Sequence, residues 1–292
     1  MVLLNRYLAL HKIVELGSFT RAAEALGYTQ SAMSQMIASL EDELSIKLLI
    51  RSRTGARLTL EGAELYPFVE RLVYQYWAVQ EKASEIKGLE TGVIRMGTLA
   101  SISTHWLPEL LRDFQTMYPN VEFVIHQGDY TSIQEWIRTG AVDFGFVNPK
   151  AVSGMETLTL KEGVMLAVLS ENHPLAELET IPLELLAKEP FILLEEGHYY
   201  EPLEAFRSLG VTPNVKYTIH DDYAIMTMVE AGLGVSILAE LILHRTNYRL
   251  ALRKTKPQVS RTISIGYKDR NHLPMASRRF IECLQSCVAK LP

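Results

Sequence analysis

The chain has 292 residues, of which 48% are apolar and 22% are charged, and these proportions exclude a largely disordered protein and favour two domains. Its net charge of −5 excludes a protein that coats nucleic acid over its whole surface, while one small basic face stays compatible with it. No apolar run approaches the roughly 20 residues that cross a bilayer, and polar residues interrupt the amino-terminal segment. We therefore expect an unexported, cytoplasmic protein that has no membrane partner.

Three helical patterns occupy the first forty residues, over 3–14, 19–26 and 30 to about 42. Ser18 and Thr29 are residue types that cap helix amino-termini, and Gly27 is suited to end the second helix. Two short helices joined by a Gly-containing turn are typical of a helix-turn-helix. The second helix of such a unit can place its first side chains in a DNA major groove.

The third predicted helix has a polar but uncharged outer surface. We expect Met33, Ile37 and Leu40 to be buried, which turns outward Gln30, Ser31, Ser34 and Gln35, side chains able to contact base edges or phosphates. Residues 44–60 then carry four positive charges and no negative one. They predict two short strands around a Thr54-Gly55 turn, a wing from which Arg51, Arg53 and Arg57 project towards phosphates. The alternative is that a small-residue helix pair and a basic hairpin are ordinary surface structure.

The run over residues 17–62 resembles the winged helix-turn-helix of LysR-type transcriptional regulators. The matching residues are Gly17-Ser18-Phe19-Thr20, Ala22-Ala23, Leu26, Gln30-Ser31, Ser34, Leu40-Glu41, Leu44, Leu48, Arg51, Leu58-Thr59 and Gly62. The chain departs from the family pattern at four positions. Tyr7 and Leu49 stand where Phe is usual, Ser45 stands where Gly is usual, and Gln35 replaces a frequent basic residue. The resemblance implies a sequence-specific regulator of transcription, not an enzyme, that binds double-stranded promoter DNA. The predicted DNA contacts are Ser18, Thr20, Thr29, Gln30, Ser31, Ser34, Gln35, Arg51, Arg53, Thr54 and Arg57.

A long amphipathic helix is predicted over 63–88, between a DNA-binding domain at 1–62 and a second domain at 89–292. Its apolar residues are spaced alternately four and three apart: Leu65, Val69, Leu72, Tyr76, Val79, Ala83 and Ile86. A seam of period 3.5 is what a helix needs to pack along a partner helix, although the same seam can lie on the core of its own chain. The resemblance implies a homodimer or homotetramer held together by this helix.

From Gly92 onward, strand and helix patterns alternate, which predicts parallel sheet with crossover helices. Two short stretches, 173–176 and 231–235, match stretches common in the same family. The layout resembles that family's effector-binding domain, an α/β module of two lobes shaped like a periplasmic binding protein. The resemblance places lobe I at about 92–162 and 267–292, and lobe II at about 163–266.

Two α/β lobes bind ligands at the carboxyl ends of their strands. The resemblance and these strand ends predict a small-molecule effector site formed by Ser101, Ile102, Ser103, Asp129, Asn148, Glu196, Gly197, His198 and Tyr199. Each of them has an alternative role as a helix cap or a packing residue. Helix amino-termini favour an anion, while Asp129 and Glu196 oppose a plain dicarboxylate, so an amine-bearing or zwitterionic metabolite is the hypothesis that fits both.

Sequence motifs for catalysis are missing: there is no GxSxG, HExxH, phosphate-binding Walker loop or GxGxxG. Cys283 and Cys287 lie one helical turn apart, which favours core packing over a redox pair. The histidines show no spacing suited to a metal. We therefore expect no cofactor besides the effector, and RNA polymerase is a further partner compatible with the resemblance. The competing hypothesis is a small-molecule binding protein or enzyme whose amino-terminal helices form an interaction domain.

Overall fold

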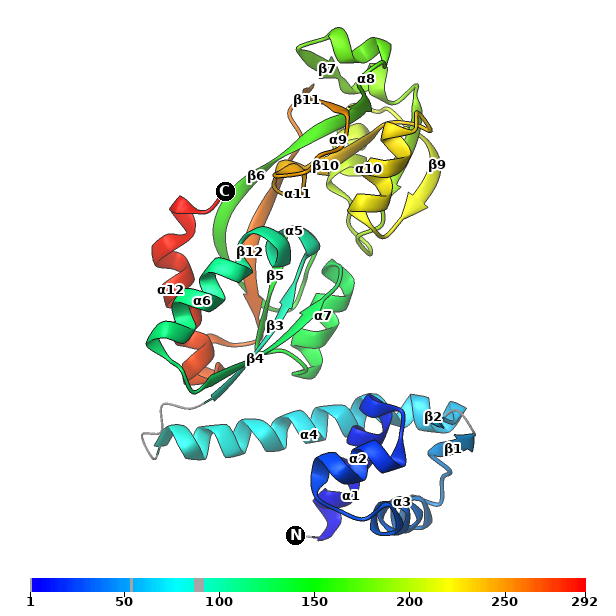
Figure 1. Ribbon diagram of the computed structural model, residues 1–292, viewed down its shortest axis with the longest axis vertical. Helices are drawn as coiled ribbons and strands as arrows, with labels where there is room; N and C mark the ends of the chain where they lie inside the picture. The colour runs from blue at the N-terminus through cyan, green and yellow to red at the C-terminus, as the bar shows by residue number, and fades with distance from the viewer. Residues whose placement is uncertain (1, 53–54, 87–91) are drawn as a thin grey trace. The chain divides into compact units, whose positions relative to one another are not determined.

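The computed structural model describes residues 2–52, 55–86 and 92–292 and divides into two units, which are described separately (Figure 1). Within the described residues, the N-terminal unit contains four helices and one hairpin. Its elements are α1 (Val2–Leu16), α2 (Phe19–Leu26), α3 (Gln30–Leu44), β1 (Leu49–Ser52), β2 (Gly55–Leu58) and α4 (Leu60–Ile86).

The predicted ends of α2 and the start of α3 are confirmed, and local chemistry explains them. Ser18 Oγ accepts a hydrogen bond from the backbone N–H of Arg21 at 3.4 Å, which caps α2. Gly27 ends that helix at a φ of 70°, a left-handed conformation that glycine adopts without penalty. Thr29 Oγ1 accepts from the N–H of Ala32 at 3.2 Å and caps α3. These contacts set the turn between the two helices.

Apolar side chains from all four helices and the hairpin form one core in this unit. Met33, Ile37 and Leu40 lie in it, as predicted, together with Leu10 and Ile13 of α1. The hairpin is tied to the α1–α2 turn, because the N–H of Ala56 donates to the carbonyl of Gly17 at 2.9 Å. A Cβ on Gly55 would overlap that carbonyl, so the close approach requires glycine there.

Helix α4 begins at Leu60, three residues before the predicted boundary, and its apolar residues face two ways. Val69 is buried in the core of its own unit, together with Val73, which the predicted seam did not include. Leu72 and Val79, by contrast, are 43% and 64% exposed. The seam is therefore split, because a helix that packs on its own domain buries one side of a wide apolar stripe and leaves the other side uncovered.

The C-terminal unit contains two lobes joined by long strands (Figure 1). Its helices are α5 (Ala100–His105), α6 (Leu107–Met117), α7 (Tyr130–Thr139), α8 (Leu183–Leu186), α9 (Glu201–Ser208), α10 (Asp222–Glu230), α11 (Glu240–Leu243) and α12 (Met275–Cys287). Its strands are β3 (Gly92–Thr98), β4 (Val121–Gln127), β5 (Phe144–Val147), β6 (Glu156–Ser170), β7 (Thr180–Pro182), β8 (Pro190–Leu194), β9 (Asn214–Ile219), β10 (Ser236–Ala239), β11 (Leu250–Lys256) and β12 (Ser260–Tyr267).

The predicted parallel sheet is wrong for the middle of this unit. The large sheet has the order β4-β3-β5-β12-β6-β11-β7, and β10 also pairs with β6. Strand β3 pairs in parallel with β4 and β5, but β12 is antiparallel to both β5 and β6. The cause lies in the topology: the chain leaves lobe I along the 15-residue strand β6 and returns along β12 in the opposite direction.

Each lobe has its own apolar core. That of lobe I surrounds Trp106, Phe144 and Phe280, whereas Phe191 and Phe206 lie in that of lobe II. The predicted lobe boundaries fall inside β6 and β12, since both strands run through the two lobes. Consequently Ile263 and Ile265, which lie in the predicted range of lobe II, pack in the core of lobe I.

Residues 100–117 form two helices, α5 and α6. Trp106 separates them, and Pro108 occupies the first turn of α6, where its missing N–H costs nothing. Ser101, which the sequence analysis assigned to the effector site at the strand ends, lies in the first turn of α5.

Candidate functional site

The amino-terminal end of α3 presents an uncharged polar surface. Gln30, Ser31 and Gln35 are exposed and Ser34 is partly exposed, as the sequence predicted. Gln30 Nε2 donates to Ser34 Oγ at 3.3 Å, and Ser34 Oγ donates to the backbone carbonyl of Gln30 at 3.0 Å. Amide and hydroxyl groups held in this way supply both donors and acceptors, which is the chemistry that reads base edges in a major groove.

The predicted wing is present as the antiparallel hairpin of β1 and β2. Arg57 is exposed on β2, and Thr20 is exposed at the start of α2. The side chain of Arg51, and Arg53 and Thr54 entirely, lie outside the described residues. The exposed aromatic ring of Tyr28 lies in the turn before α3 and was not among the predicted contacts.

A cavity of about 230 Å³ lies between the two lobes of the C-terminal unit. Three of the nine predicted effector residues line it: Ser101, Asp129 and Glu196. The other residues of its lining are Leu99, Ala100, Gln127, Gly128, Met165, Leu194, Glu195, His220, Asp222, Ala239 and Arg261. The cavity is therefore lined by residues at the ends of β4, β8 and β9 and at the starts of α5 and α10.

Three of the remaining predicted residues make contacts within lobe I or between lobe I and α9. Ile102 is fully buried in the core of lobe I. Ser103 Oγ donates to the backbone carbonyl of Leu99 at 3.2 Å. Asn148 Nδ2 donates to Glu201 Oε1 at 2.8 Å, and this carboxylate also accepts from the hydroxyl of Tyr130. None of these three side chains lies in the described lining of the cavity.

Gly197, His198 and Tyr199 join the lobes instead of lining the cavity. The N–H of His198 donates to Thr131 Oγ1 at 3.0 Å, across from lobe II to lobe I. Gly197 has a φ of 90° and packs so closely on Thr131 that a Cβ would overlap its hydroxyl. The ring of Tyr199 lies 6.5 Å from that of Tyr130, centroid to centroid.

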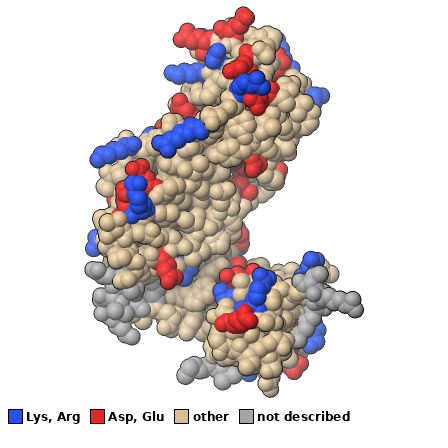
Figure 2. All heavy atoms as spheres, viewed as in Figure 1, with Lys and Arg blue, Asp and Glu red and all other residues tan. Residues whose placement is uncertain are grey.

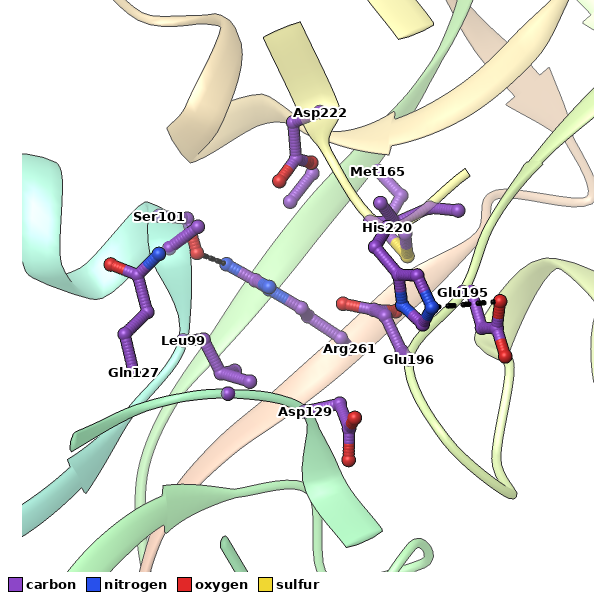
Figure 3. Close-up of a pocket in the computed structure, with 14 residues that line it drawn as sticks. Leu99, Ser101, Gln127, Asp129, Met165, Glu195, Glu196, His220, Asp222 and Arg261 are labelled. Atoms are coloured by element: carbon purple, nitrogen blue, oxygen red, sulfur yellow. Dashed lines mark hydrogen bonds and ion pairs between the residues drawn. The ribbon is translucent and has the colours of Figure 1, made fainter. Parts of the chain in front are cut away.

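Arg261 is one of the cavity residues that the sequence interpretation missed. It lies in β12, is 4% exposed, and donates from Nη2 to Ser101 Oγ at 2.7 Å (Figure 3). Its Nε is buried without a hydrogen-bond partner among the described residues. Alternation along β12 is a signal that could have found it, because Arg261 shares its face of the strand with Ile263 and Ile265, which are buried.

Carboxylates surround this guanidinium. In Figure 3, Glu196, Asp222 and Asp129 lie on different sides of Arg261, and His220 Nε2 lies 3.2 Å from Glu195 Oε2. Burial raises the pKa of Asp222 to about 6, against the opposing effect of the Arg261 charge. Burial, reinforced by the neighbouring Glu201 carboxylate, also raises the pKa of Glu196 well above its ordinary value. The cavity is therefore acidic around one buried cation.

Other classes of site find no support in the described part of the chain. No helix there is both long and apolar enough to span a bilayer. No group of three or more His, Cys, Asp or Glu side chains there is arranged to hold a metal ion. Cys287 packs beside the core of lobe I, and burial raises the pKa of its thiol, which favours the unreactive protonated form. On the face shown in Figure 2, acidic and basic side chains are interspersed over the C-terminal unit.

Comparison with known proteins assigns both units. Residues 4–63 match the family model of the bacterial regulatory helix-turn-helix proteins of the lysR family, and residues 87–288 match the LysR substrate binding domain. The chain is 33% identical over 274 residues to the HTH-type transcriptional regulator YvbU of Bacillus subtilis, covering 93% of this chain and 94% of the relative.

Solved structures agree over the full length. Full-length OxyR from Pseudomonas aeruginosa is 25% identical, with a TM-score of 0.68 and coverage of 100% of this chain and 98% of that one. Full-length CbnR in complex with its target DNA is 19% identical, with a TM-score of 0.69 and coverage of 97% and 99%. The fold, the two family matches and the relative agree that this chain belongs to the LysR family of DNA-binding transcriptional regulators, which are not enzymes and carry an effector-binding domain.

Proposed function

We propose that α3 reads a promoter sequence with Gln30, Ser31, Ser34 and Gln35 while the wing binds the phosphate backbone. The observation that carries this proposal is the division of α3 into two faces: Met33 and Ile37 are buried, whereas the amide and hydroxyl side chains face outward. No charged residue lies between Gly27 and Leu40, so attraction to DNA comes from the wing, where Arg57 is exposed.

Two copies of the chain associate through α4 in this proposal. Phe68, Leu72 and Val79 are exposed apolar side chains within about 40° of one another around the helix, at 100° per residue. A neutral reading helix binds DNA weakly by itself, and a dimer doubles both its base contacts and its phosphate contacts. The CbnR structure with target DNA shows that a protein of this fold binds DNA.

The cavity between the lobes is the proposed effector site. An effector that binds one arrangement of the lobes better than another shifts the population of the two arrangements, by a coupling free energy that is typically about 1–3 kcal/mol. The resulting change in the placement of the DNA-binding units alters DNA bending or contact with RNA polymerase. A protein with this role works in the cytoplasm, where the promoter DNA is.

A gel shift on the DNA upstream of the gene, repeated at several salt concentrations, tests the proposal. Gln30→Ala should relax base preference, with each lost base contact worth roughly 1–3 kcal/mol, while Arg57→Ala should weaken all sequences alike and flatten the salt dependence by about one unit per wing. Arg112→Ala, which removes an exposed positive charge from α6, is the matched control and should change neither property. Binding without sequence preference that disappears near physiological salt would contradict the proposal.

A further inference from the structure

We propose that the effector of this protein is a small zwitterion whose anionic group binds Arg261 and Ser101 and whose ammonium group binds Glu196 and Asp222. The inference rests on the proposed function, because it takes the cavity between the lobes as the effector site. It adds the chemical class of the effector and assigns a role to each charged group of that cavity.

The anionic half of the ligand follows from Arg261. A guanidinium has five N–H donors in a planar fork that matches a carboxylate with two parallel hydrogen bonds. Nη2 donates to the neutral hydroxyl of Ser101, and Nε is buried without a partner among the described residues, so none of the described hydrogen bonds gives the guanidinium an anionic acceptor. A buried donor left unpaired is costly, so an anion from the ligand supplies what the protein itself does not. Ser101, which lines the same wall, can donate its hydroxyl proton to that anion.

The cationic half follows from the carboxylates. Asp129, Glu196 and Asp222 line the cavity together with the Glu195–His220 pair, so negative groups outnumber the one guanidinium. Asp129 Oδ1 already accepts the backbone N–H of Ser132, which leaves Glu196 and Asp222 as the groups most in need of a cation. Burial disfavours the charged form of both, and an ammonium group bound beside them in the cavity would reverse that effect.

Simpler ligands satisfy only part of the cavity. A dicarboxylate would place a second negative charge beside Glu196 and Asp222, where like charges repel. A simple amine would pair with those carboxylates but leave Arg261 Nε without an acceptor. A zwitterion satisfies both halves at once. The cavity, at about 230 Å³, is below the roughly 300–1,000 Å³ typical of drug-sized ligands, which favours a compact molecule such as an α-amino acid.

The test uses the full-length protein and matched sets of probes. A thermal-shift screen of the twenty standard L-amino acids comes first, and isothermal titration then compares each hit with its analogues. For L-leucine these are 4-methylpentanoate, which lacks the amine, and 3-methylbutylamine, which lacks the carboxylate; for L-serine they are 3-hydroxypropionate and ethanolamine. Succinate and glutarate represent dicarboxylates. We expect at least one amino acid to bind tenfold or more tightly than either of its analogues.

Variants then assign the two halves. Arg261→Met should weaken binding of that amino acid at least tenfold. Arg261→Lys, which keeps a positive charge at this position, should weaken it less. Glu196→Gln and Asp222→Asn should instead erase the preference for the amino acid over the analogue that lacks the amine. Glu171→Gln, an exposed acidic residue outside the cavity, is the matched control and should leave both affinities unchanged.

Two outcomes would overturn the proposal: tighter binding of a dicarboxylate or an amine than of every amino acid, or no binding of any amino acid in the set. A preference that survives in both Glu196→Gln and Asp222→Asn would also overturn it. A gel shift without ligand shows whether the effector class alone is wrong or whether the proposed regulatory function is wrong as well. Specific DNA binding by a protein that ignores zwitterions would contradict only the effector class, whereas a protein that binds an amino acid but no promoter would contradict the regulatory role.

Discussion

The backbone N–H of Leu48, just before the wing, donates to Glu41 Oε1 in α3 at 2.8 Å. The N–H of Leu49 donates to the same oxygen at 3.2 Å, and Lys47 Nζ donates to the other oxygen at 2.7 Å. Burial by itself raises the pKa of Glu41, which is 7% exposed, but these donors outweigh it and hold the pKa below its ordinary value. One carboxylate therefore fixes the start of the hairpin to the C-terminal end of α3.

Glu41→Gln should lower the free energy of unfolding at neutral pH by about 1–3 kcal/mol, because the buried N–H of Leu48 and the partly buried N–H of Leu49 lose a charged acceptor. The folded pKa of Glu41 is depressed, so its contribution is present above pH 4.5 and is lost as the pH falls through the lower folded value. The difference between the proteins should therefore shrink in acid. Denaturant unfolding at pH 7 and pH 3.5 measures it, with exposed Glu24→Gln as control; equal stability of the two variants would contradict the role of Glu41.

Ser45→Gly should stabilise the N-terminal unit by about 1 kcal/mol. Ser45 ends α3 at a φ of 55°, a left-handed conformation that costs a residue with a Cβ roughly 1–2 kcal/mol, and the greater freedom of glycine in the unfolded chain offsets part of this gain. Ser39→Gly makes the same chemical change inside α3 and should instead destabilise by about 0.5 kcal/mol. Thermal unfolding of both variants checks that stability rises for Ser45→Gly and falls for Ser39→Gly. A fall in stability for both variants would rule out strain at Ser45.

Leu72→Asp should shift the protein towards the monomer. The side chain is 43% exposed within its own unit, so an isolated chain can solvate the new carboxylate, whereas a paired α4 would bury it against a second apolar stripe. Ala78→Asp introduces the same charge at an exposed position about 120° away around the helix and should preserve the oligomer. Sedimentation at micromolar concentration gives the readout. If the Leu72 and Ala78 variants sediment alike, the exposed stripe is not the pairing surface.

Gly197→Ala should destabilise the C-terminal unit more than Gly154→Ala. Both glycines have positive φ, 90° and 69°, so both substitutions strain the backbone. A Cβ at Gly154 meets nothing within 4 Å, whereas one at Gly197 lies 2.9 Å from Thr131 Cβ. The difference in unfolding free energy between the Gly197→Ala and Gly154→Ala variants should be about 1–3 kcal/mol. It measures the steric cost of a Cβ at the contact of Gly197 with Thr131. Equal losses measured by denaturant unfolding would show that the lobes adapt freely there.

Asp222→Asn should raise the thermal stability of the ligand-free protein at pH 7.5 by several degrees. Because the pKa of Asp222 is about 6 in the folded state and about 3.9 in an unfolded chain, its ionisation destabilises the fold progressively as the pH rises from about 4 to 6. The advantage of the variant should therefore narrow at pH 4.5. Calorimetry at the two pH values, with Glu171→Gln as control, measures the difference in thermal stability between the variant and the parent protein. A stability gain that does not depend on pH would argue against a buried, ionised Asp222.

The sequence by itself determined those parts of the molecule whose causes are local. Ser18 and Thr29 cap helices with N–H groups three residues away, and Gly27 needs only its own freedom at positive φ, so the helix-turn-helix could be read directly from the residue order. The seven apolar residues of α4 were equally visible. Their periodicity could not decide that Val69 packs inside its own unit while Leu72 faces outward, because that depends on where α1 crosses the helix.

Only the tertiary structure decided the composition of the cavity between the lobes. Arg261 meets Ser101 across 160 residues of sequence, and it does so because β6 and β12 run antiparallel through both lobes, an arrangement that the alternating strand and helix pattern did not predict. Glu196, which follows β8, and Asp222, which begins α10, line the same cavity as Arg261 although they come from different parts of lobe II. Capping acts between neighbours in the chain, whereas pairing of buried charges acts between whichever segments the fold brings together.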